Sequence, residues 1–186
     1  FLQPDEAPRL FSALDAEPQL WQDFFRLALL TGARKSNLRT MRWDQVHGNI
    51  WTIPAGSAKA GKAIDVHLVP DAVAILDRRR RDSRSDWVFP SPVVSGPIST
   101  VSAAWRRITQ RAGLENFNPH DLRRTFGSYQ ALAGSSLVEI GRSLGHAPGS
   151  KATAIYARLT SDAVRQSAER GVAKLLEAAN GNKEGG

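Results

Sequence analysis

From Asn118 to Ser128 the chain reads NPHDLRRTFGS, which places a histidine and an arginine near the start of a predicted helix. Asn118 is a good N-cap and Pro119 suits the first helical turn, so a helix is predicted to begin here. His120 and Arg123 are three residues apart and therefore share one face of that helix. Because the N-terminal end of a helix carries partial positive charge, this face suits a phosphate group. Taken alone, the pair can equally be a helix-start residue beside a solvated arginine.

Two further motifs carry candidate site residues. In TGARKSNLR, Arg34 follows a helix-ending glycine, so its guanidinium can project into a cleft, although the motif alone favours a surface arginine. In LGHAPGSKATAIY, His146 follows a glycine stop and Tyr156 comes ten residues later on a short helix. Tyr156 can also be a core residue. Tyr129, the other tyrosine, lies in an apolar run and is expected to pack in the core.

Apolar periodicity predicts a mainly helical chain with one β-hairpin. The hairpin strands are residues 50–53 and 64–68, their long tip carries Lys59 and Lys62, and Trp87–Phe89 is predicted as a short third strand. The segment from Pro90 to Pro97 is predicted as a loop. The sequence predicts two helices within residues 4–32, one at 71–81, one at 101–112 and one that begins at 119. It also predicts one capped by Ser136 with Glu139, one capped by Ser150 and one at 164–176.

Composition favours a nucleic-acid partner without proving it. The 25 Lys and Arg residues outnumber the 18 Asp and Glu residues, which gives a formal charge of +7 and a sequence pI near 10.4. Such a surface attracts polyanions, although ribosomal, membrane-surface and heparin-binding proteins share the property. The absence of cysteine excludes disulfides, thiolate metal sites and thiol nucleophiles, and no apolar run is long enough to span a membrane. Because the first residue is Phe1, we expect a piece of a longer protein.

The candidate residues form an ordered set: Arg34, Lys59, His120, Arg123, His146 and Tyr156. This set resembles the tyrosine recombinase family, also called phage integrases. Catalytic domains of that family carry an Arg after a Thr-Gly turn, a hairpin Lys, His-x-x-Arg, Leu-Gly-His and a C-terminal Tyr. The resemblance spans nearly the whole chain. One departure is Asn37, where many members have an acidic residue, and an amide cannot supply the negative charge that orients a cation.

The resemblance implies a fold and an organisation. The fold is α+β and mainly α, a helical catalytic domain with a small antiparallel three-stranded sheet at one edge. Residues 1–178 are expected to form that domain and residues 179–186 a disordered tail. An N-terminal DNA-binding domain is expected to be absent from this piece.

The resemblance also implies the activity: site-specific cleavage and rejoining of DNA through a 3′-phosphotyrosyl intermediate, in integration or excision. Tyr156 is the expected nucleophile and His120 its base, while Arg34 and Arg123 hold the phosphate. His146 is expected to donate to a non-bridging oxygen, and Lys59 to protonate the leaving 5′-hydroxyl, with Lys62 as the alternative acid. Neither a metal nor ATP is expected to be needed.

Double-stranded DNA is therefore the expected partner. Backbone contacts are predicted for a set of basic residues outside the catalytic group: Lys35, Arg39, Arg42, Lys62, Arg106, Arg107, Arg111 and Arg124. The run from Arg78 to Arg81 is a weaker candidate, since a charged helix end is usually solvated. The whole protein is expected to act as a tetramer on paired DNA sites, with possible accessory DNA-bending proteins, and the present chain as a monomer. Location in the cytoplasm, at the nucleoid, follows from this function.

Three alternatives stay open on the sequence. The chain can be a non-catalytic or decayed DNA-binding module on the same fold, although retention of all six positions speaks against that. It can be a type IB topoisomerase-like or resolvase enzyme, which uses the same nucleophile on a different substrate. A metal hydrolase using His120 and His146 lacks recognisable ligand spacing.

Overall fold

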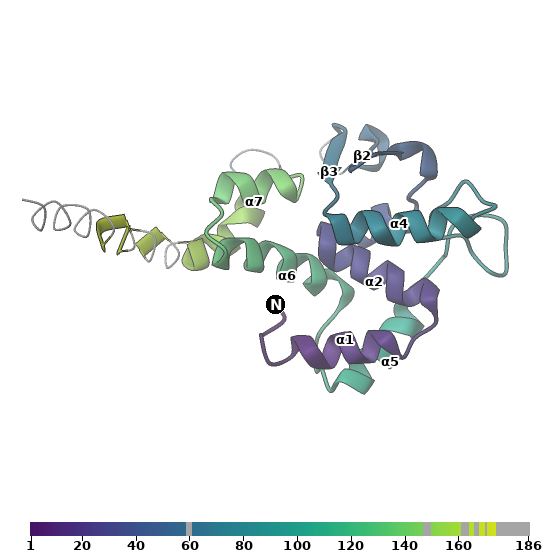
Figure 1. The fold of residues 1–186 in the computed structure, drawn as a ribbon, viewed down its shortest axis with the longest axis horizontal. Helices are drawn as coiled ribbons and strands as arrows, with labels where there is room; N and C mark the ends of the chain where they lie inside the picture. The colour runs from purple at the N-terminus through teal and green to yellow at the C-terminus, as the bar shows by residue number, and fades with distance from the viewer. Residues whose placement is uncertain (59–60, 147–149, 161–163, 166–167, 170, 174–186) are drawn as a thin grey trace, which may run out of the picture. The chain divides into compact units, whose positions relative to one another are not determined.

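The computed structural model describes residues 1–58, 61–146, 150–160, 164–165, 168–169 and 171–173 (Figure 1). Contacts divide the chain into two compact units. The first unit contains Phe1–Phe126 together with Ser143–Gly145, and the second contains Gly127–Arg142 and His146–Gly186. The single domain expected over residues 1–178 stays a prediction, and the expected tail lies outside the described residues.

Helices make up most of the first unit. They are α1 (Ala7–Asp15), α2 (Gln19–Thr31), α3 (Lys35–Arg39), α4 (Pro70–Asp82), α5 (Ser102–Ala112) and the start of α6 (Pro119–Leu132), with short 3₁₀ turns at Trp43–Gln45 and Ala55–Ser57. Prolines open α1 and α4, where the missing N–H is harmless. Left-handed glycines end α2 and α5 at Gly32 and Gly113, as the sequence predicts. In this unit α1 packs on α5, and α2 packs on α4 (Figure 1).

A small antiparallel sheet completes the first unit. Its order is β1 (Val46–His47), β2 (Ile50–Ile53) and β3 (Ile64–His67), so the predicted hairpin is confirmed. The prediction of Trp87–Phe89 as the third strand is wrong. Trp87 forms one isolated bridge with Arg42, and Val88 and Phe89 are buried against the core instead of lying in the sheet. The real third strand, β1, is two residues long and carries no alternating pattern by which it could be recognised.

Aromatic side chains from distant segments form the centre of this core. Phe24 and Phe25 of α2 meet edge to face at 5.2 Å between ring centroids, and Phe24 meets Phe89 at 5.1 Å. Phe25 lies 4.7 Å from Trp105 of α5. Trp51 alternates inward from β2. Burying each of these rings contributes roughly 2–3 kcal/mol, so the core fixes α2, α5 and the sheet relative to one another.

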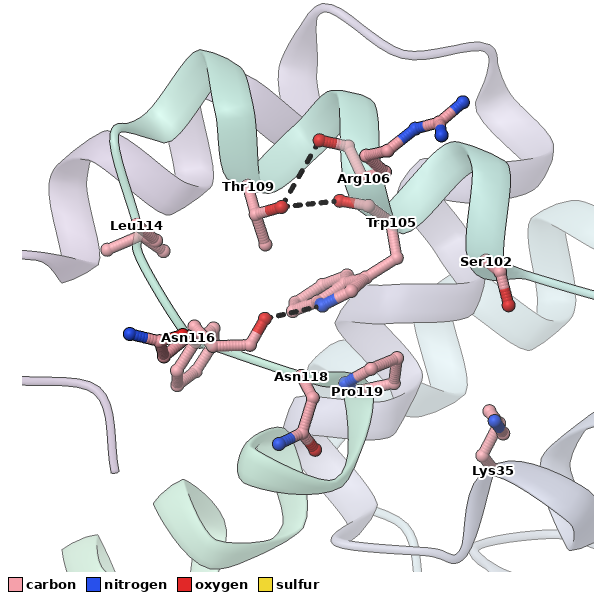
Figure 2. Close-up of a pocket in the computed structure, with 10 residues that line it drawn as sticks. Lys35, Ser102, Trp105, Arg106, Thr109, Leu114, Asn116, Asn118 and Pro119 are labelled. Carbon is pink, nitrogen blue, oxygen red and sulfur yellow. Dashed lines mark hydrogen bonds between the residues drawn. The ribbon is translucent and has the colours of Figure 1, made fainter.

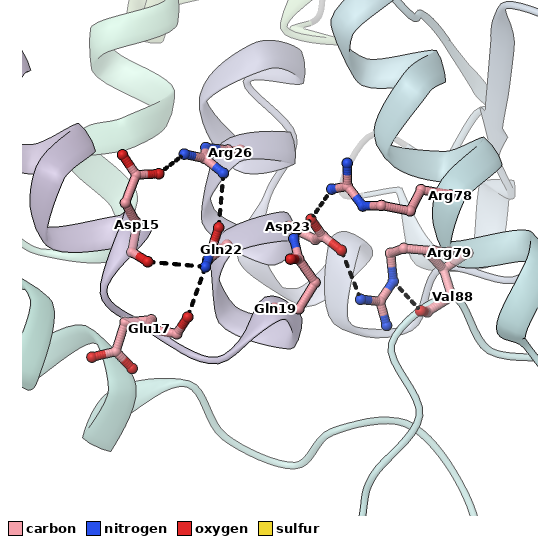
Figure 3. A network of polar contacts seen from close by, with 9 residues as sticks. All are labelled: Asp15, Glu17, Gln19, Gln22, Asp23, Arg26, Arg78, Arg79 and Val88. Carbon is pink, nitrogen blue, oxygen red and sulfur yellow. Dashed lines mark hydrogen bonds and ion pairs between the residues drawn. The ribbon is translucent and has the colours of Figure 1, made fainter.

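Two buried acids pair with arginines, and we call this set the carboxylate network: Glu17, Asp23, Arg78, Arg79, Arg107 and Arg111. Asp23 is fully buried and accepts from Arg78 at 2.5 Å and from Arg79 at 3.0 Å (Figure 3). Arg107 and Arg111 donate to Glu17 at 2.6 and 3.0 Å. Burial raises the pKa of Glu17, but the hydrogen bonds and charges of both arginines outweigh burial, so its pKa lies below the usual value. These pairs join α2 to α4, and the segment after α1 to α5.

The second unit contains the rest of α6, α7 (Leu137–Ser143) and the 3₁₀ helix η3 (Lys151–Tyr156), followed by helical residues 157–160. The predicted caps are confirmed. Ser136 and Glu139 exchange hydrogen bonds at the start of α7, and the Ser150 hydroxyl accepts from the Ala152 amide at 3.3 Å. Of the predicted helix over 164–176, residues 164–165, 168–169 and 171–173 are described and are helical, and the remaining residues lie outside the described part of the chain.

The prediction that Tyr129 packs in the core is wrong. Its side chain is exposed, at 39% of its full accessibility. Buried positions on α6 recur at residues 122, 125, 128 and 131, and Tyr129 falls beside this stripe. An apolar neighbourhood in sequence therefore does not bury a ring that points off the packed face.

Candidate functional site

The turn that carries Arg34 depends on a left-handed glycine. Gly32 has a φ of 59°, and its amide donates to the Ala28 carbonyl at 3.0 Å. A methyl group on Gly32 would lie 2.3 Å from the Phe126 ring and 2.9 Å from the Leu144 side chain, so both backbone and neighbours require glycine. Arg34 then adopts an extended backbone at the start of α3 and is half-buried. The predicted position of Arg34 just after a helix stop is confirmed.

Arg123 joins three of the sequence motifs. It lies on α6, and its buried guanidinium donates from Nη1 to the Gly32 carbonyl at 2.6 Å and from Nη2 to the Leu144 carbonyl at 2.5 Å. Gly32 belongs to the Thr-Gly-x-Arg turn, and Leu144 belongs to the Leu-Gly-His motif. A guanidinium has five N–H donors, so two carbonyl acceptors fix its plane without by themselves exhausting its donors. Carbonyl oxygens also carry only partial charge, so they do not neutralise it.

His120, near the start of α6, sits in a positive field. Partial desolvation lowers the pKa of His120 below its usual value, and the charge of Arg123 lowers it further. Asp121 acts in the opposite direction, while Arg124 and Arg34 add to the lowering. This lowered pKa favours the neutral imidazole, which can accept a proton. The charges of Arg34 and Arg123 both lower the pKa of His120. We call these three residues the clamp: Arg34, His120 and Arg123.

Reciprocal hydrogen bonds fix the start of α6. The His120 amide donates to the Asn118 side-chain oxygen at 3.0 Å, and the Asn118 amide donates to the Asp121 carboxylate at 2.9 Å. This is a capping-box arrangement, and it confirms the predicted cap at Asn118. The second carboxylate oxygen of Asp121 accepts from Arg124 at 3.3 Å. The backbone that carries His120 is thus well defined.

A groove of about 500 Å³ lies beside this helix start. Figure 2 shows that its lining comes from α5, from the loop that leads into α6 and from Lys35. Trp105 forms part of its wall and donates from its indole to the Phe117 carbonyl at 2.8 Å. Lys35 and Arg106 bring exposed cationic side chains to it. The groove therefore combines positive charge with a partly apolar wall.

His146 contacts α7 and η3 within the second unit. Its amide donates to the Gly141 carbonyl at 2.8 Å, which ties it to α7. Its ring nitrogen Nδ1 lies 2.9 Å from the Thr153 hydroxyl of η3. The side chain is half-buried. His146 therefore has a defined ring orientation.

Tyr156 is the last residue of η3 and is buried, with 3% of its surface exposed. Within the second unit its phenol packs on the backbone of α6 at Gly127. A methyl group on Gly127 would lie 2.6 Å from the Tyr156 hydroxyl oxygen and 2.5 Å from Cζ. The segment continues as a helical turn in which Thr160 donates to the Ala157 carbonyl at 2.9 Å. The absence of a side chain at Gly127 makes room for the ring.

The hairpin tip and the departure at Asn37 complete the predicted set. Lys59 lies outside the described residues, so its role stays a prediction. Lys62 is exposed, on the side of the tip that leads into β3. Asn37 is buried in α3, and its Nδ2 has no hydrogen-bond partner in the part of the chain that the structure describes. The amide at the usually acidic position is therefore enclosed and partly unsatisfied.

Several basic residues predicted to contact DNA also have partners within the chain. Arg39 donates to the Ile98 carbonyl at 2.9 Å. Arg42 pairs with Asp44 and Asp86, each at 3.3 Å, and lies over the Trp87 ring. Arg107 and Arg111 belong to the carboxylate network, as do Arg78 and Arg79, and Arg124 pairs with Asp121. DNA contact stays a prediction for each of the eight residues named in the sequence analysis.

Sequence reasoning missed residues that act through tertiary contacts. Gly32 and Leu144 were recognised as parts of motifs, but not as carbonyl acceptors for Arg123. Glu17 pairs with Arg107 and Arg111, which lie 90 and 94 positions later in the sequence. No local sequence pattern indicates such a pair. Thr153 contacts His146 across seven positions. Its place three residues before Tyr156 was the one local signal that could have drawn attention to it.

The fold and the order of these motifs agree with one known protein family. The model of the phage integrase family matches residues 1–162, and the chain belongs to that family. The integrase of Salmonella phage P22 is 33% identical over 159 residues, which are 76% of this chain and 40% of that relative. The chain thus spans less than half the length of this curated relative.

Solved structures show the same fold. The catalytic domain of bacteriophage HP1 integrase matches with a TM-score of 0.68 at 21% identity, over 91% of this chain and 93% of that one. A lambda integrase tetramer bound to a Holliday junction matches with a TM-score of 0.67 at 23% identity, over 83% of this chain and 47% of that one. The predicted helical fold with a small three-stranded antiparallel sheet is confirmed.

Membrane-spanning helices and metal-binding clusters are both absent from the described residues. None of the helices there has the length and apolar character needed to cross a bilayer. In the same residues, His, Asp and Glu side chains do not gather in groups of three or more that could hold a metal ion.

Proposed function

We propose that this chain is the catalytic domain of a site-specific tyrosine recombinase that cleaves and rejoins DNA through a 3′-phosphotyrosyl bond at Tyr156. Membership of the phage integrase family supports the class of reaction. One observation carries the assignment of the site: the Arg123 guanidinium is fixed by the carbonyls of Gly32 and Leu144. The charges of Arg123 and Arg34 also both act on His120. Three motifs that are far apart in sequence thus meet at one cation.

The clamp suits a phosphodiester in the transition state. In-line displacement adds negative charge to the non-bridging oxygens, and guanidinium groups bind such oxygens through two parallel hydrogen bonds. Arg34 and Arg123 supply these groups and stay charged at any working pH. The lowered pKa of His120 keeps its imidazole neutral, so it can take the phenolic proton as Tyr156 attacks phosphorus.

Bond making and breaking balance without a further reactant. The Tyr156 oxygen forms a bond to phosphorus, its proton passes to His120, and the bond from phosphorus to the 5′ oxygen breaks. Lys59 supplies the proton to that leaving oxygen, with Lys62 as the alternative, and His146 donates to a non-bridging oxygen. Because the ester keeps the bond energy, rejoining is the reverse reaction, and the proposal needs neither ATP nor a metal. Because the phenol of Tyr156 is buried against Gly127, the proposal requires this side chain to leave its seat on Gly127 when DNA binds.

The groove beside α6 is the proposed path of one DNA strand. Lys35 and Arg106 at its lining can each neutralise a backbone phosphate next to the clamp. Double-stranded DNA is therefore the proposed partner, and assembly on paired sites as a tetramer is proposed for the whole protein. A lambda integrase tetramer bound to a Holliday junction has the same fold, which supports this proposal. The proposed location is the cytoplasm, where bacterial DNA lies.

A covalent-adduct assay tests the nucleophile. The chain is incubated with nicked duplexes randomised around the nick, so that the released fragment cannot re-ligate, and detergent-resistant adducts are separated on a denaturing gel. Wild type is expected to form adducts, and Tyr156→Phe is expected to form none while retaining DNA affinity, because only the nucleophilic oxygen is removed. Tyr129→Phe is the matched control and is expected to form adducts normally. Adducts in Tyr156→Phe, or a modified peptide that lacks Tyr156, would overturn the assignment.

A further inference from the structure

Thr153 contacts the ring of His146 from the same short helix that carries Tyr156. Its hydroxyl oxygen lies 2.9 Å from His146 Nδ1, and the residue is buried, with 9% of its surface exposed. Its amide donates to the Ser150 carbonyl at 3.0 Å, so the start of η3 fixes its backbone. On the other side the hydroxyl faces Gly141, where a methyl group would lie 3.3 Å from Oγ1. Thr153 is thus wedged between α7 and the imidazole.

The direction of this hydrogen bond follows from the needs of the hydroxyl group. A buried hydroxyl proton without an acceptor is unfavourable, so it will be donated wherever an acceptor lies within reach. Among the described residues, His146 Nδ1 is the one hydrogen-bond partner found for the Thr153 side chain. The hydroxyl therefore donates and Nδ1 accepts, which leaves the ring proton of a neutral His146 on Nε2.

We propose that Thr153 is a positioning residue, whose hydroxyl donates to Nδ1 of His146 and holds the imidazole in the tautomer that carries its proton on Nε2. The proposal rests on the proposed function, in which His146 donates to a phosphate oxygen. The opposite tautomer would present a lone pair to that oxygen and repel it. Thr153 thus makes His146 a hydrogen-bond donor without requiring the ring to be positively charged.

The same contact relates His146 to the nucleophile. In a 3₁₀ helix, side chains three positions apart lie on one side, and Thr153 and Tyr156 are three positions apart in η3. The hydrogen bond from Thr153 therefore holds the face of η3 that bears Tyr156 against the ring of His146. The Thr153 hydroxyl therefore links the orientation of the His146 ring to the position of Tyr156.

Nitrogen NMR of the histidine rings tests the tautomer without any DNA. The four histidines are labelled with ¹⁵N, and the signals of His146 are assigned by their loss in His146→Gln. At a pH where the ring is neutral, wild type and Thr153→Ser are expected to show Nε2 protonated and Nδ1 as acceptor. Thr153→Val, which keeps the shape and removes the hydroxyl, is expected to shift both signals toward a mixture of tautomers. Thr160→Val is the matched control, a buried threonine of the next turn whose hydroxyl bonds backbone carbonyls, and should leave the signals unchanged. A proton on Nδ1 in wild type, or identical spectra in Thr153→Val, overturns the proposal.

Cleavage rates then test whether the contact serves the reaction. Thr153→Val is expected to slow single-turnover cleavage roughly tenfold, as for the loss of one hydrogen bond that strengthens in the transition state, and Thr153→Ser to restore most of the rate. In a His146→Gln background, Thr153→Val is expected to have no further effect, because it acts through the ring. An additive loss contradicts the positioning role. If His146→Gln itself cleaves normally, the proposed role of His146 fails, while the NMR result still decides the tautomer.

Discussion

The carboxylate network and the clamp both consist largely of arginines, yet they meet different partners. In the carboxylate network, arginines bind buried acids: Asp23 takes Arg78 and Arg79, and Glu17 takes Arg107 and Arg111. In the clamp, backbone carbonyls hold Arg123. Partial burial lowers the pKa of His120, and the charges of Arg123 and Arg34 lower it further. The partner, and not the residue type, distinguishes the arginines that pair with buried acids from the arginine that we propose for the phosphate.

The difference has an energetic reason. A buried carboxylate without its cation is strongly destabilising, so the carboxylate network must form when the chain folds. A carbonyl oxygen carries only partial charge, so it offsets less of a guanidinium's charge than a carboxylate does, and a phosphate that binds there is still attracted. Mutations in the two groups should therefore separate stability from catalysis.

The largest expected effect is on cleavage by Arg34→Ala. Loss of one guanidinium from the clamp is expected to slow single-turnover cleavage by at least about 10³-fold, with much smaller changes in DNA affinity, because the contact strengthens in the transition state. Urea unfolding should change by less than about 0.5 kcal/mol, since Arg34 is half-buried at a surface turn. Arg78→Ala is the comparison from the carboxylate network and should cleave normally while folded. Equal losses of affinity and rate in Arg34→Ala contradict the clamp.

The opposite pattern is expected for Asp23→Ala. Removing a fully buried carboxylate leaves Arg78 and Arg79 without the acceptor that they share, so the free energy of unfolding should fall by about 3–5 kcal/mol. Asp15→Ala is the matched control, because Asp15 pairs with Arg26 at an exposed position (Figure 3) and should contribute no more than about 1 kcal/mol. Urea titrations give both values. Comparable losses in the two variants would mean that burial does not distinguish these ion pairs.

Local chemistry predicted much of this fold and site. Two helices end at Gly32 and Gly113, and one begins at Asn118, as the sequence predicts. Such caps can be predicted because they depend on neighbouring residues. The motifs also predicted that His120 and Arg123 are neighbours. Arg34 acts on the same ring, because its charge lowers the pKa of His120.

What the sequence could not show depends on contacts between distant segments. Arg107 and Arg111 reach Glu17 because α5 packs on α1. The sequence alone therefore could not show whether these arginines contact DNA or pair with an acid. The third strand was misplaced because apolar burial of Val88 and Phe89 looks the same in a strand and in a buried loop. Tyr129 was misplaced because the buried stripe of α6 passes beside it.

A smaller effect is expected at the groove, which carries charge without a buried acid. Lys35→Ala and Arg106→Ala should each weaken DNA binding about equally for all sequences. Each should reduce the slope of log affinity against log salt concentration by about 1, because one phosphate contact releases about one counterion. Fluorescence anisotropy over a range of salt concentrations gives the slopes. An unchanged slope in both variants would place the DNA elsewhere.

The smallest expected effect is a shift in the titration of His120. Arg124→Ala removes a charge that lowers the pKa of His120 and also frees Asp121, which raises it, so the pKa should rise. Because the base must be neutral, the acid limb of the cleavage profile should move to higher pH in this variant. Proton NMR of the His120 ring follows the titration directly. A pKa that falls or stays the same would mean that the arginines do not set the charge state of the base.

The clamp is tested most directly by the structure of the Tyr156→Phe chain on an uncleaved DNA site. The guanidinium groups of Arg34 and Arg123 should both lie about 3 Å from non-bridging oxygens of one phosphate, the one that the wild type attacks. Arg34 and Arg123 on different phosphates, or turned away from DNA, would contradict a shared role in catalysis.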